Sequence, residues 1–472
     1  MDNSNKNKAL VSGTLIYAIG NFGTKILTFL IVPLYTFYIK PGDLGDYDLL
    51  MTTVSLLSPL LTMKISDATY RWIINDRDNE VPSISATYQL LLQNCMLCAV
   101  LLLLVNYFIP IWHCYYFIAI LICDRILECL QKLLRGIKKQ KLFAMSGLFY
   151  TALLVSLNFI QICVLKKGVI ALLQGVIISQ IATIALILLV EKRLRVLKLS
   201  SDYRSLQKEM LKYSIPLVPS ALCWWVMSAS NRYVIRWILG KSANGIFAVA
   251  CKFPSILQTV FLMFNNSWTD LALAELEKDK ESEKYTSKIF EQLYKLSFGL
   301  ATILIPATKV VTQLILSDSY KSASVYIGFL YLGTVFQGLS SFCSIGYLKG
   351  KKTIGAATTS LYGAVVNLTV DVILINFIGL FAASLSTFLG FFVMWLVRMR
   401  DIRDVFPVRI NKFMFITRLI AVIVIAAVTI WTNVYIDLIL TCVFGLFVLI
   451  ENRKSINLII SKIRKKLKFK TI

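Results

Sequence analysis

Cationic side chains lie inside apolar stretches that are long enough to cross a membrane. They are Lys25, Arg232, Arg236 and Lys252. A cation inside a bilayer costs about 2.5–3.5 kcal/mol or more unless it meets water or a partner. Three explanations are open: these side chains bind an anion within the membrane, form structural ion pairs, or snorkel to the interface. Arg236 is close enough to the end of its stretch to snorkel, whereas Arg232 lies deeper.

Polar residues accompany two of these cations. Asn21 precedes Lys25 by four residues, which places both on one face of a helix. Asn231 directly precedes Arg232. We therefore take Lys25, Arg232 and Lys252 as the first candidates for an anion site, with Asn21, Asn231 and Arg236 beside them. The neighbouring aromatic residues either stack on sugar rings or form an interfacial belt; they are Trp224, Trp225, Tyr233 and Trp237.

Intramembrane acids suggest a second kind of chemistry, the uptake of an ion. Asp124 and Glu128 share one apolar stretch with Arg125 and Lys132, at spacings that favour pairing along a helix. This stretch is either a self-neutralised polar stripe or the place where a carboxylate takes up a proton. Asp371 is a second candidate, and it stands alone in its stretch. A low dielectric favours the neutral form of such a carboxyl group, as proton coupling requires.

The sequence has few residues of the kinds that covalent catalysis or metal binding requires. His113 is the single histidine, which excludes a catalytic triad based on histidine and a site with several histidine ligands. Cys95 and Cys98 have the spacing of a redox or zinc motif, but they lie in a leucine-rich stretch without a second pair, and packing explains them better. We expect no enzyme activity, no metal site and no cofactor, apart from H⁺ or Na⁺ as a coupling ion.

The composition indicates a membrane protein. Of 472 residues, 57% are hydrophobic and 16% charged, whereas soluble domains have about 25% charged residues. The net charge of +24 does not indicate a nucleic-acid partner, because the basic residues gather in short gaps between apolar stretches. We predict an all-α polytopic protein with about fourteen spans: 9–39, 45–65, 84–109, 112–133, 143–165, 168–190, 213–239, 243–269, 287–316, 322–348, 353–376, 378–398, 412–431 and 434–450.

The distribution of lysine and arginine predicts the orientation. Gaps on one side of the membrane, together with both termini, carry 37 of the 50. The gaps on the other side carry only Lys40, Lys166, Lys167, Lys241 and Lys321. Because cytoplasmic segments are enriched in lysine and arginine, both termini are expected in the cytoplasm. The basic, amphipathic C-terminal tail is expected to contact anionic membrane lipids.

A shift of 200 residues produces a weak self-match, in which 44–47 falls on 244–247. The two segments each follow a long apolar stretch and open the next one. We therefore predict two related six-helix lobes, at 1–190 and 213–400. A cytoplasmic linker at 191–212 joins them, two further helices follow at 401–450, and a basic cytoplasmic tail occupies 451–472. Bundles built from repeats are typical of transporters, with the binding site between the halves.

At this point the sequence resembles the Wzx-type polysaccharide flippases, which transport O-antigen and capsule units and belong to the multidrug/oligosaccharidyl-lipid/polysaccharide (MOP) exporter superfamily. The resemblance rests on a Pro-x-x-Pro, an Asn-Arg pair and a Gly-x-Phe in the second half, and on a Gly-Asn, a lysine, a proline and a Gly-x-Tyr in the first. These are Pro216 and Pro219, Asn231 and Arg232, Gly245 and Phe247, then Gly20 and Asn21, Lys25, Pro33, Gly45 and Tyr47. Asn231 replaces the more common aspartate, which leaves Arg232 without an adjacent carboxylate.

The resemblance implies a function. Such proteins move an oligosaccharide linked to undecaprenyl diphosphate from the inner to the outer leaflet of the bacterial cytoplasmic (inner) membrane, in an ion-driven, alternating-access cycle for surface polysaccharide biosynthesis. The implied partners are the lipid-linked oligosaccharide, membrane lipids and the polysaccharide polymerase machinery. A small-molecule exporter of the multidrug and toxin extrusion (MATE) type is the alternative, although a cationic-drug exporter should have an acidic cavity. A membrane glycan polymerase or ligase is a third class, disfavoured because every outer gap is short.

Overall fold

The computed structural model describes residues 23–25, 27–75, 80–196, 203–275, 280–350, 353–451 and 453. Within these ranges every regular element is a helix. The chain divides into two compact units, residues 1–249 with 367–379, and residues 250–366 with 380–472. It passes from one unit to the other three times: within α12 (Lys241–Lys252), within α16 (Thr353–Ile378), and between Gly379 and Leu380.

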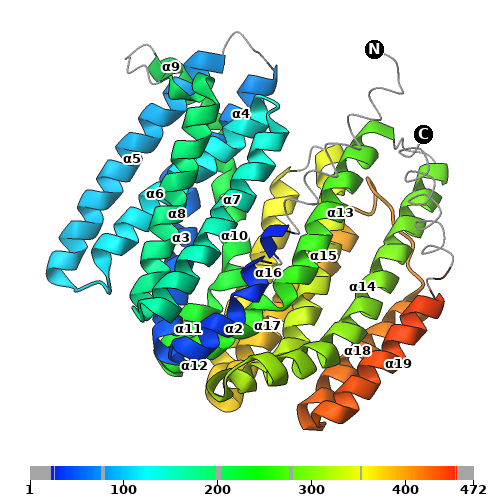
Figure 1. The fold of residues 1–472 in the computed structure, drawn as a ribbon. Coiled ribbons are helices and arrows are strands. Elements are labelled where there is room, and N and C mark those ends of the chain that lie inside the picture. The colour runs from blue at the N-terminus through cyan, green and yellow to red at the C-terminus, as the bar shows by residue number, and fades with distance from the viewer. Residues whose placement is uncertain are drawn as a thin grey trace, which may run out of the picture. The chain divides into compact units, whose positions relative to one another are not determined.

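The first unit contains the helices up to the start of α12 and the C-terminal half of α16 (Figure 1). Its other main helices are α2 (Val32–Tyr38), α3 (Pro41–Thr62), α4 (Ile65–Asn75), α5 (Glu80–Phe108), α6 (Cys114–Gly136), α7 (Gln140–Phe159) with a following π turn (Ile160–Val164), α8 (Val169–Val190), α9 (Arg204–Ser214), α10 (Val218–Ala229) and α11 (Asn231–Ile238). Helices α4 and α9 lie at one end of this unit, and α2, α11 and α12 lie at the opposite end (Figure 1).

The second unit is built around a cluster of aromatic side chains. Its helices are α13 (Pro254–Glu275), α14 (Lys280–Ile315), α15 (Ile327–Gly350), α17 (Leu380–Asp401), α18 (Lys412–Trp431) and α19 (Val434–Glu451), with a 3₁₀ segment at Asp318–Tyr326. Trp395 stacks on Phe415 with ring centroids 5.0 Å apart, and Phe336 packs against both rings. These contacts join α15, α17 and α18 into one core. Such aromatic contacts stabilise beyond the area that they bury.

Nine of the described helices are long and apolar enough to cross a membrane, and two bent helix pairs would add two more. The first pair is α3 with α4, which meet at an angle of 56°. The share of the apolar stretch that is buried within the protein ranges from 11% in α19 (Val434–Glu451) to 72% in Asp318–Tyr347, and it is 17% in α5. Helices with apolar outer faces satisfy their own backbone groups in lipid. The chain is therefore an all-α multi-pass membrane protein, as the sequence predicts. The total of fourteen spans stays a prediction.

The starts of α3 and α12 cross at very short range inside the first unit. A Cβ atom on Gly45 would overlap the carbonyl oxygen of Lys241, and a Cβ atom on Gly245 would overlap that of Pro41. Asn244 Nδ2 also donates a hydrogen bond to the Gly45 carbonyl at 2.7 Å. We call this contact the α3–α12 crossing. Its two halves correspond at an offset of 200 residues, so the self-match in the sequence marks a real and reciprocal contact.

Candidate anion and ion-coupling sites

Arg232 is held between α11 and α3. Its Nε atom lies 3.0 Å from Asp48 Oδ2, and its Nη1 donates to the Ser228 carbonyl at 2.8 Å. The two side chains are nearly buried, with 13% of Arg232 and 15% of Asp48 exposed. The guanidinium also lies 5.9 Å from the centre of the Phe247 ring. The missing carboxylate next to Arg232 in the sequence is thus replaced by one that comes from another helix.

Arg236 forms a second, parallel ion pair one turn further along α11. Its Nε atom lies 3.1 Å from Asp46 Oδ1. Arg236 is 40% exposed, against 16% for Asp46. Helical spacing of four residues aligns Arg232 and Arg236 on one face of α11, and the start of α3 supplies an acid to each. Of the explanations open for Arg236, the structure supports an ion pair.

Further along α3, aromatic side chains from α10 and α11 form hydrogen bonds with hydroxyl side chains of α3. Trp225 Nε1 donates to Ser55 Oγ at 3.0 Å, and the Tyr233 hydroxyl lies 2.6 Å from Thr53 Oγ1. The Trp225 and Tyr233 rings meet edge to face with centroids 5.9 Å apart. These two rings therefore face α3, whereas Trp237 is 89% exposed. Arg232 lies at the end of a polar surface that combines indole, phenol and hydroxyl groups.

The other predicted anion ligands are more dispersed. Asn21 lies outside the described residues. Lys25 lies half-buried on the helical segment that leads to α2, and Asn231 is buried at the start of α11. Lys252 lies half-buried in the last turn of α12 and belongs to the second unit. Of the predicted ligands, Arg232 and Arg236 form ion pairs that connect α11 to α3 within the first unit.

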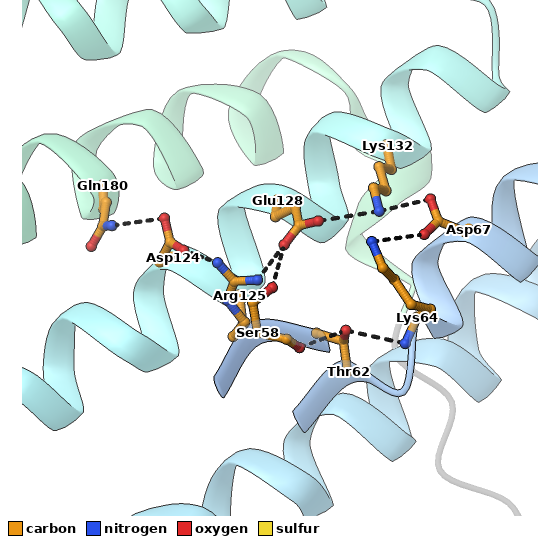
Figure 2. Close-up of polar contacts among 9 residues, drawn as sticks. All are labelled: Ser58, Thr62, Lys64, Asp67, Asp124, Arg125, Glu128, Lys132 and Gln180. Carbon is orange, nitrogen blue, oxygen red and sulfur yellow. Dashed lines mark hydrogen bonds and ion pairs between the residues drawn. The ribbon is translucent and has the colours of Figure 1, made fainter. Parts of the chain in front are cut away.

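The acids of α6 belong to a continuous chain of charges (Figure 2). Arg125 donates to Asp124 and Glu128, and Lys132 Nζ lies 3.1 Å from Glu128 Oε1 and 2.8 Å from Asp67 Oδ1. At one end Gln180 Nε2 lies 3.3 Å from Asp124 Oδ1. We call this set, with Lys64 and the hydroxyl residues Ser58 and Thr62, the α6 network. It joins α6 to α8, α3 and α4.

The α6 network also holds the bend between α3 and α4. Met63 and Lys64 link the two helices with positive φ values of 44° and 57°, a conformation that side chains disfavour. Lys64 Nζ lies 3.6 Å from Asp67 Oδ2, and its backbone nitrogen donates to Thr62 Oγ1 at 3.3 Å. Three acids and three bases balance in the network, so its charges are neutralised locally. This arrangement is what the polar-stripe interpretation of α6 predicts.

Asp371 has very different surroundings on α16. Its side chain is fully buried, and within the described residues neither carboxylate oxygen has a hydrogen-bond partner. One turn earlier, Asn367 Oδ1 lies 3.4 Å from Ser230 Oγ of the α10–α11 junction. A buried carboxyl group without partners is costly as an anion. Asp371 is therefore suited to ion coupling, in which a carboxyl group is neutral in one state and binds a cation or a proton during the cycle.

Two buried cations of the second unit were not predicted as site residues. Arg398, 2% exposed, donates to the Ser340 carbonyl at 2.9 Å and to Ser344 Oγ at 2.8 Å. Lys309 of α14 lies 3.2 Å from Asp437 of α19. The first contact joins α17 to α15, and the second fixes the α18–α19 hairpin to α14. Both have the geometry of structural anchors. Among the described residues there is no cluster of histidine, cysteine, aspartate or glutamate that could hold a metal ion.

Known proteins resemble this chain in sequence and in fold. A family model for polysaccharide biosynthesis proteins matches residues 10–269, more than half of the chain. The chain belongs to this family. The match includes both arginines of α11 and the acids of α6, but ends before Asp371. No curated protein sequence matches the chain. The family assignment confirms the polysaccharide side of the predicted resemblance.

Solved structures place this polysaccharide biosynthesis protein in the MOP fold. The lipid II flippase MurJ, in an inward closed conformation, has a TM-score of 0.71 at 15% identity, over 94% of this chain and 100% of that chain. A MATE family multidrug resistance transporter of the MOP superfamily has a TM-score of 0.63 when inward-facing, at 15% identity, covering 83% and 95%. Its outward-facing form gives 0.58 at 16% identity, covering 83% and 94%. These likenesses confirm the predicted fold class.

Proposed function

We propose that this protein is a flippase that moves an oligosaccharide linked to undecaprenyl diphosphate from the inner to the outer leaflet of a bacterial cytoplasmic membrane. The observation that carries the proposal is the nearly buried Arg232, which ends a surface of indole, phenol and hydroxyl groups. A guanidinium suits a phosphate group, and aromatic rings with hydroxyl groups suit sugars. The polysaccharide family and the fold shared with a lipid II flippase support the same substrate class.

The proposed cycle is alternating access between two lobes, 1–190 and 213–400, driven by H⁺ or Na⁺. Asp371 is the proposed coupling group, because its buried carboxylate has no hydrogen-bond partner among the described residues. The lysine and arginine distribution supports cytoplasmic termini, and in that orientation the α3–α12 crossing would lie at the outer surface. The flipped units would pass to polysaccharide polymerase machinery on that side. The protein would act as a transporter rather than an enzyme.

The MATE fold is compatible with a second function, the export of small molecules. The charges argue against the cationic drugs that such a transporter would carry. Lys25 is half-buried and Arg232 is nearly buried on membrane helices of the first unit, and their positive charges disfavour a cationic substrate. We therefore prefer an anionic, lipid-linked substrate.

Charge reversal at the anion site tests the proposal. In vesicles that contain the purified protein and a fluorescent undecaprenyl-diphosphate oligosaccharide, Arg232→Glu and Lys25→Glu should each lower the flipping rate by about tenfold or more, since each removes a charge-assisted contact to the diphosphate. Lys166→Glu, in an exposed loop, is the control and should flip at the normal rate. Normal flipping by both charge-reversed proteins would remove the basis for an anion site.

A further inference from the structure

The pair between Arg232 and Asp48 has a consequence for gating. We propose that Asp48 occupies, in the resting protein, the place on the Arg232 guanidinium that a diphosphate takes when substrate arrives. Substrate binding then releases α3 from α11 and loosens the α3–α12 crossing. Asp48 is thus a positioning residue, a carboxylate that the ligand displaces. This inference rests on the proposed function for the anion, and it adds a link between anion binding and the opening of one end of the protein.

The geometry makes the exchange feasible. Arg232 keeps other contacts, among them the bond from Nη1 to the Ser228 carbonyl one turn earlier and the Phe247 ring 5.9 Å away, which hold the guanidinium in place when the acid leaves. The side chains of Arg232 and Asp48 are 13% and 15% exposed, so the pair is largely buried but a ligand can still reach it. A diphosphate carries more charge than a carboxylate and offers several oxygens to the planar guanidinium. It therefore competes well for this arginine.

The position of Asp48 explains what the exchange would release. Asp48 lies one turn after Gly45, at which α3 touches α12. Without this ion pair, the start of α3 is still held, within the part of the chain that the structure describes, by the Asn244 bond to the Gly45 carbonyl at 2.7 Å and by the pair between Arg236 and Asp46. The latter is weak, because Arg236 is 40% exposed and exposed ion pairs contribute little. The displaced carboxylate and the bound diphosphate also repel each other, which favours separation.

Contacts further along α3 limit the movement to its beginning. Thr53 lies 2.6 Å from the Tyr233 hydroxyl, and Ser55 accepts from Trp225 at 3.0 Å. Neither contact involves a charge that the ligand would take. The helix can therefore part from α11 at Asp48 while it stays attached at Thr53 and Ser55. In the proposed orientation the end that opens is the outer one, to which the oligosaccharide must be delivered.

Ligand binding by the full-length protein in nanodiscs tests the exchange. The probe is farnesyl diphosphate, which carries the diphosphate without the sugar. Asp48→Asn should bind it about threefold to tenfold more tightly than the unchanged protein, because a competing carboxylate is removed. Asp46→Asn, the matched control one pair away, should stay within about twofold, and Arg232→Gln should bind about tenfold more weakly or worse.

The outcomes separate this inference from the proposed function. Binding that depends on Arg232 but is equal or weaker in a folded Asp48→Asn protein would overturn the exchange and leave the anion site in place. If neither the unchanged protein nor Asp48→Asn binds the probe, both proposals are wrong. A thermal unfolding measurement on each variant identifies a protein that has failed to fold.

A cross-linking measurement reads the opening itself. Lys40→Cys and Ser242→Cys flank the two sides of the crossing, and a short bifunctional reagent should join them in a full-length protein whose ten native cysteines are replaced. Farnesyl diphosphate should lower the cross-linked fraction. Adding Asp48→Asn should lower it without the ligand, whereas Asp46→Asn should lower it less. A fraction that neither the ligand nor Asp48→Asn changes would contradict the proposed release, even if the binding result were as expected.

Discussion

The α6 network and Asp371 are both intramembrane acids of the first unit, but their surroundings are opposite. In the α6 network every acid has a base within reach, and Arg125 and Lys132 each contact two of the acids. Asp371 is fully buried, and within the described residues its oxygens have no hydrogen-bond partner. The comparison shows two situations for an acid in a membrane helix. Neighbouring bases and hydrogen-bond donors can stabilise its charged form, or the charged form can lack partners and carry the whole free-energy cost of leaving water. Only the second situation leaves a group that gains from binding a cation or a proton.

The largest expected effect is a loss of ion coupling on substitution of Asp371, which distinguishes this residue from the acids of the α6 network. Asp371→Asn should abolish the response of flipping to an ion gradient, because the amide cannot change charge. A potential of about 100 mV supplies about 2.3 kcal/mol per charge moved, so the ratio of outer to inner substrate should fall by up to about fiftyfold. The measurement is flipping in vesicles with and without a H⁺ or Na⁺ gradient.

The matched control for this prediction is Glu128→Gln in the α6 network, which should still respond to the gradient. The converse result, with coupling lost in Glu128→Gln and kept in Asp371→Asn, would transfer the coupling role to α6. Asp371→Asn should also leave the free energy of unfolding unchanged or raise it, since it removes a carboxyl group that is costly to bury as an anion.

The next effect concerns stability. Arg125→Met should lower the free energy of unfolding by about 2–4 kcal/mol, because it leaves Asp124 and Glu128 without their shared base; both acids are about one-third exposed, which moderates the loss. Denaturation in detergent measures the change. Arg193→Met is the control, since Arg193 is 64% exposed and 3.8 Å from Glu191. An equal loss in both proteins would mean that the α6 network contributes little.

The smallest effect belongs to Lys132, which connects α6 to α4. Lys132→Met should cost about 1 kcal/mol, because this lysine is partly exposed and its two acids keep other partners. A double-mutant cycle with Asp67→Asn measures the coupling between the helices. Strict additivity of the two single effects would indicate that the Lys132–Asp67 pair does not hold the bend between α3 and α4.

Much of the fold was predictable because apolar length is a strong local signal. The expected spans at 84–109, 168–190 and 412–431 correspond to α5, α8 and α18. Helix breaks were harder to predict. Met63 and Lys64 form the bend after α3, and Ser230 separates α10 from α11, yet none of these residues is a glycine or a proline. Their conformations depend on packing against other helices, which one segment of sequence does not encode.

For the candidate anion site, the sequence predicted the arginines but not their acidic partners. Arg232 and Arg236 were found because cations are costly in apolar stretches, and the same argument applies to Asp46 and Asp48 at the start of α3. Those acids were missed because they lie 190 and 184 residues away from their partners. Spacing along one helix does not reveal such a pair. The self-match of 44–47 with 244–247 was an indirect signal, since these two segments also meet in the structure.

The α3–α12 crossing consists largely of backbone atoms, because both residues at the closest approach are glycines. A contact of this kind has few side-chain rotamers to order when it forms, so re-forming it carries a smaller entropic cost than closing an interlocked apolar surface. It also tolerates no substitution, since even an alanine at Gly45 or Gly245 would meet a carbonyl oxygen. In the proposed cycle the two glycines would allow this contact to close in the same way after each opening, and a single added methyl group at either position would prevent complete closure.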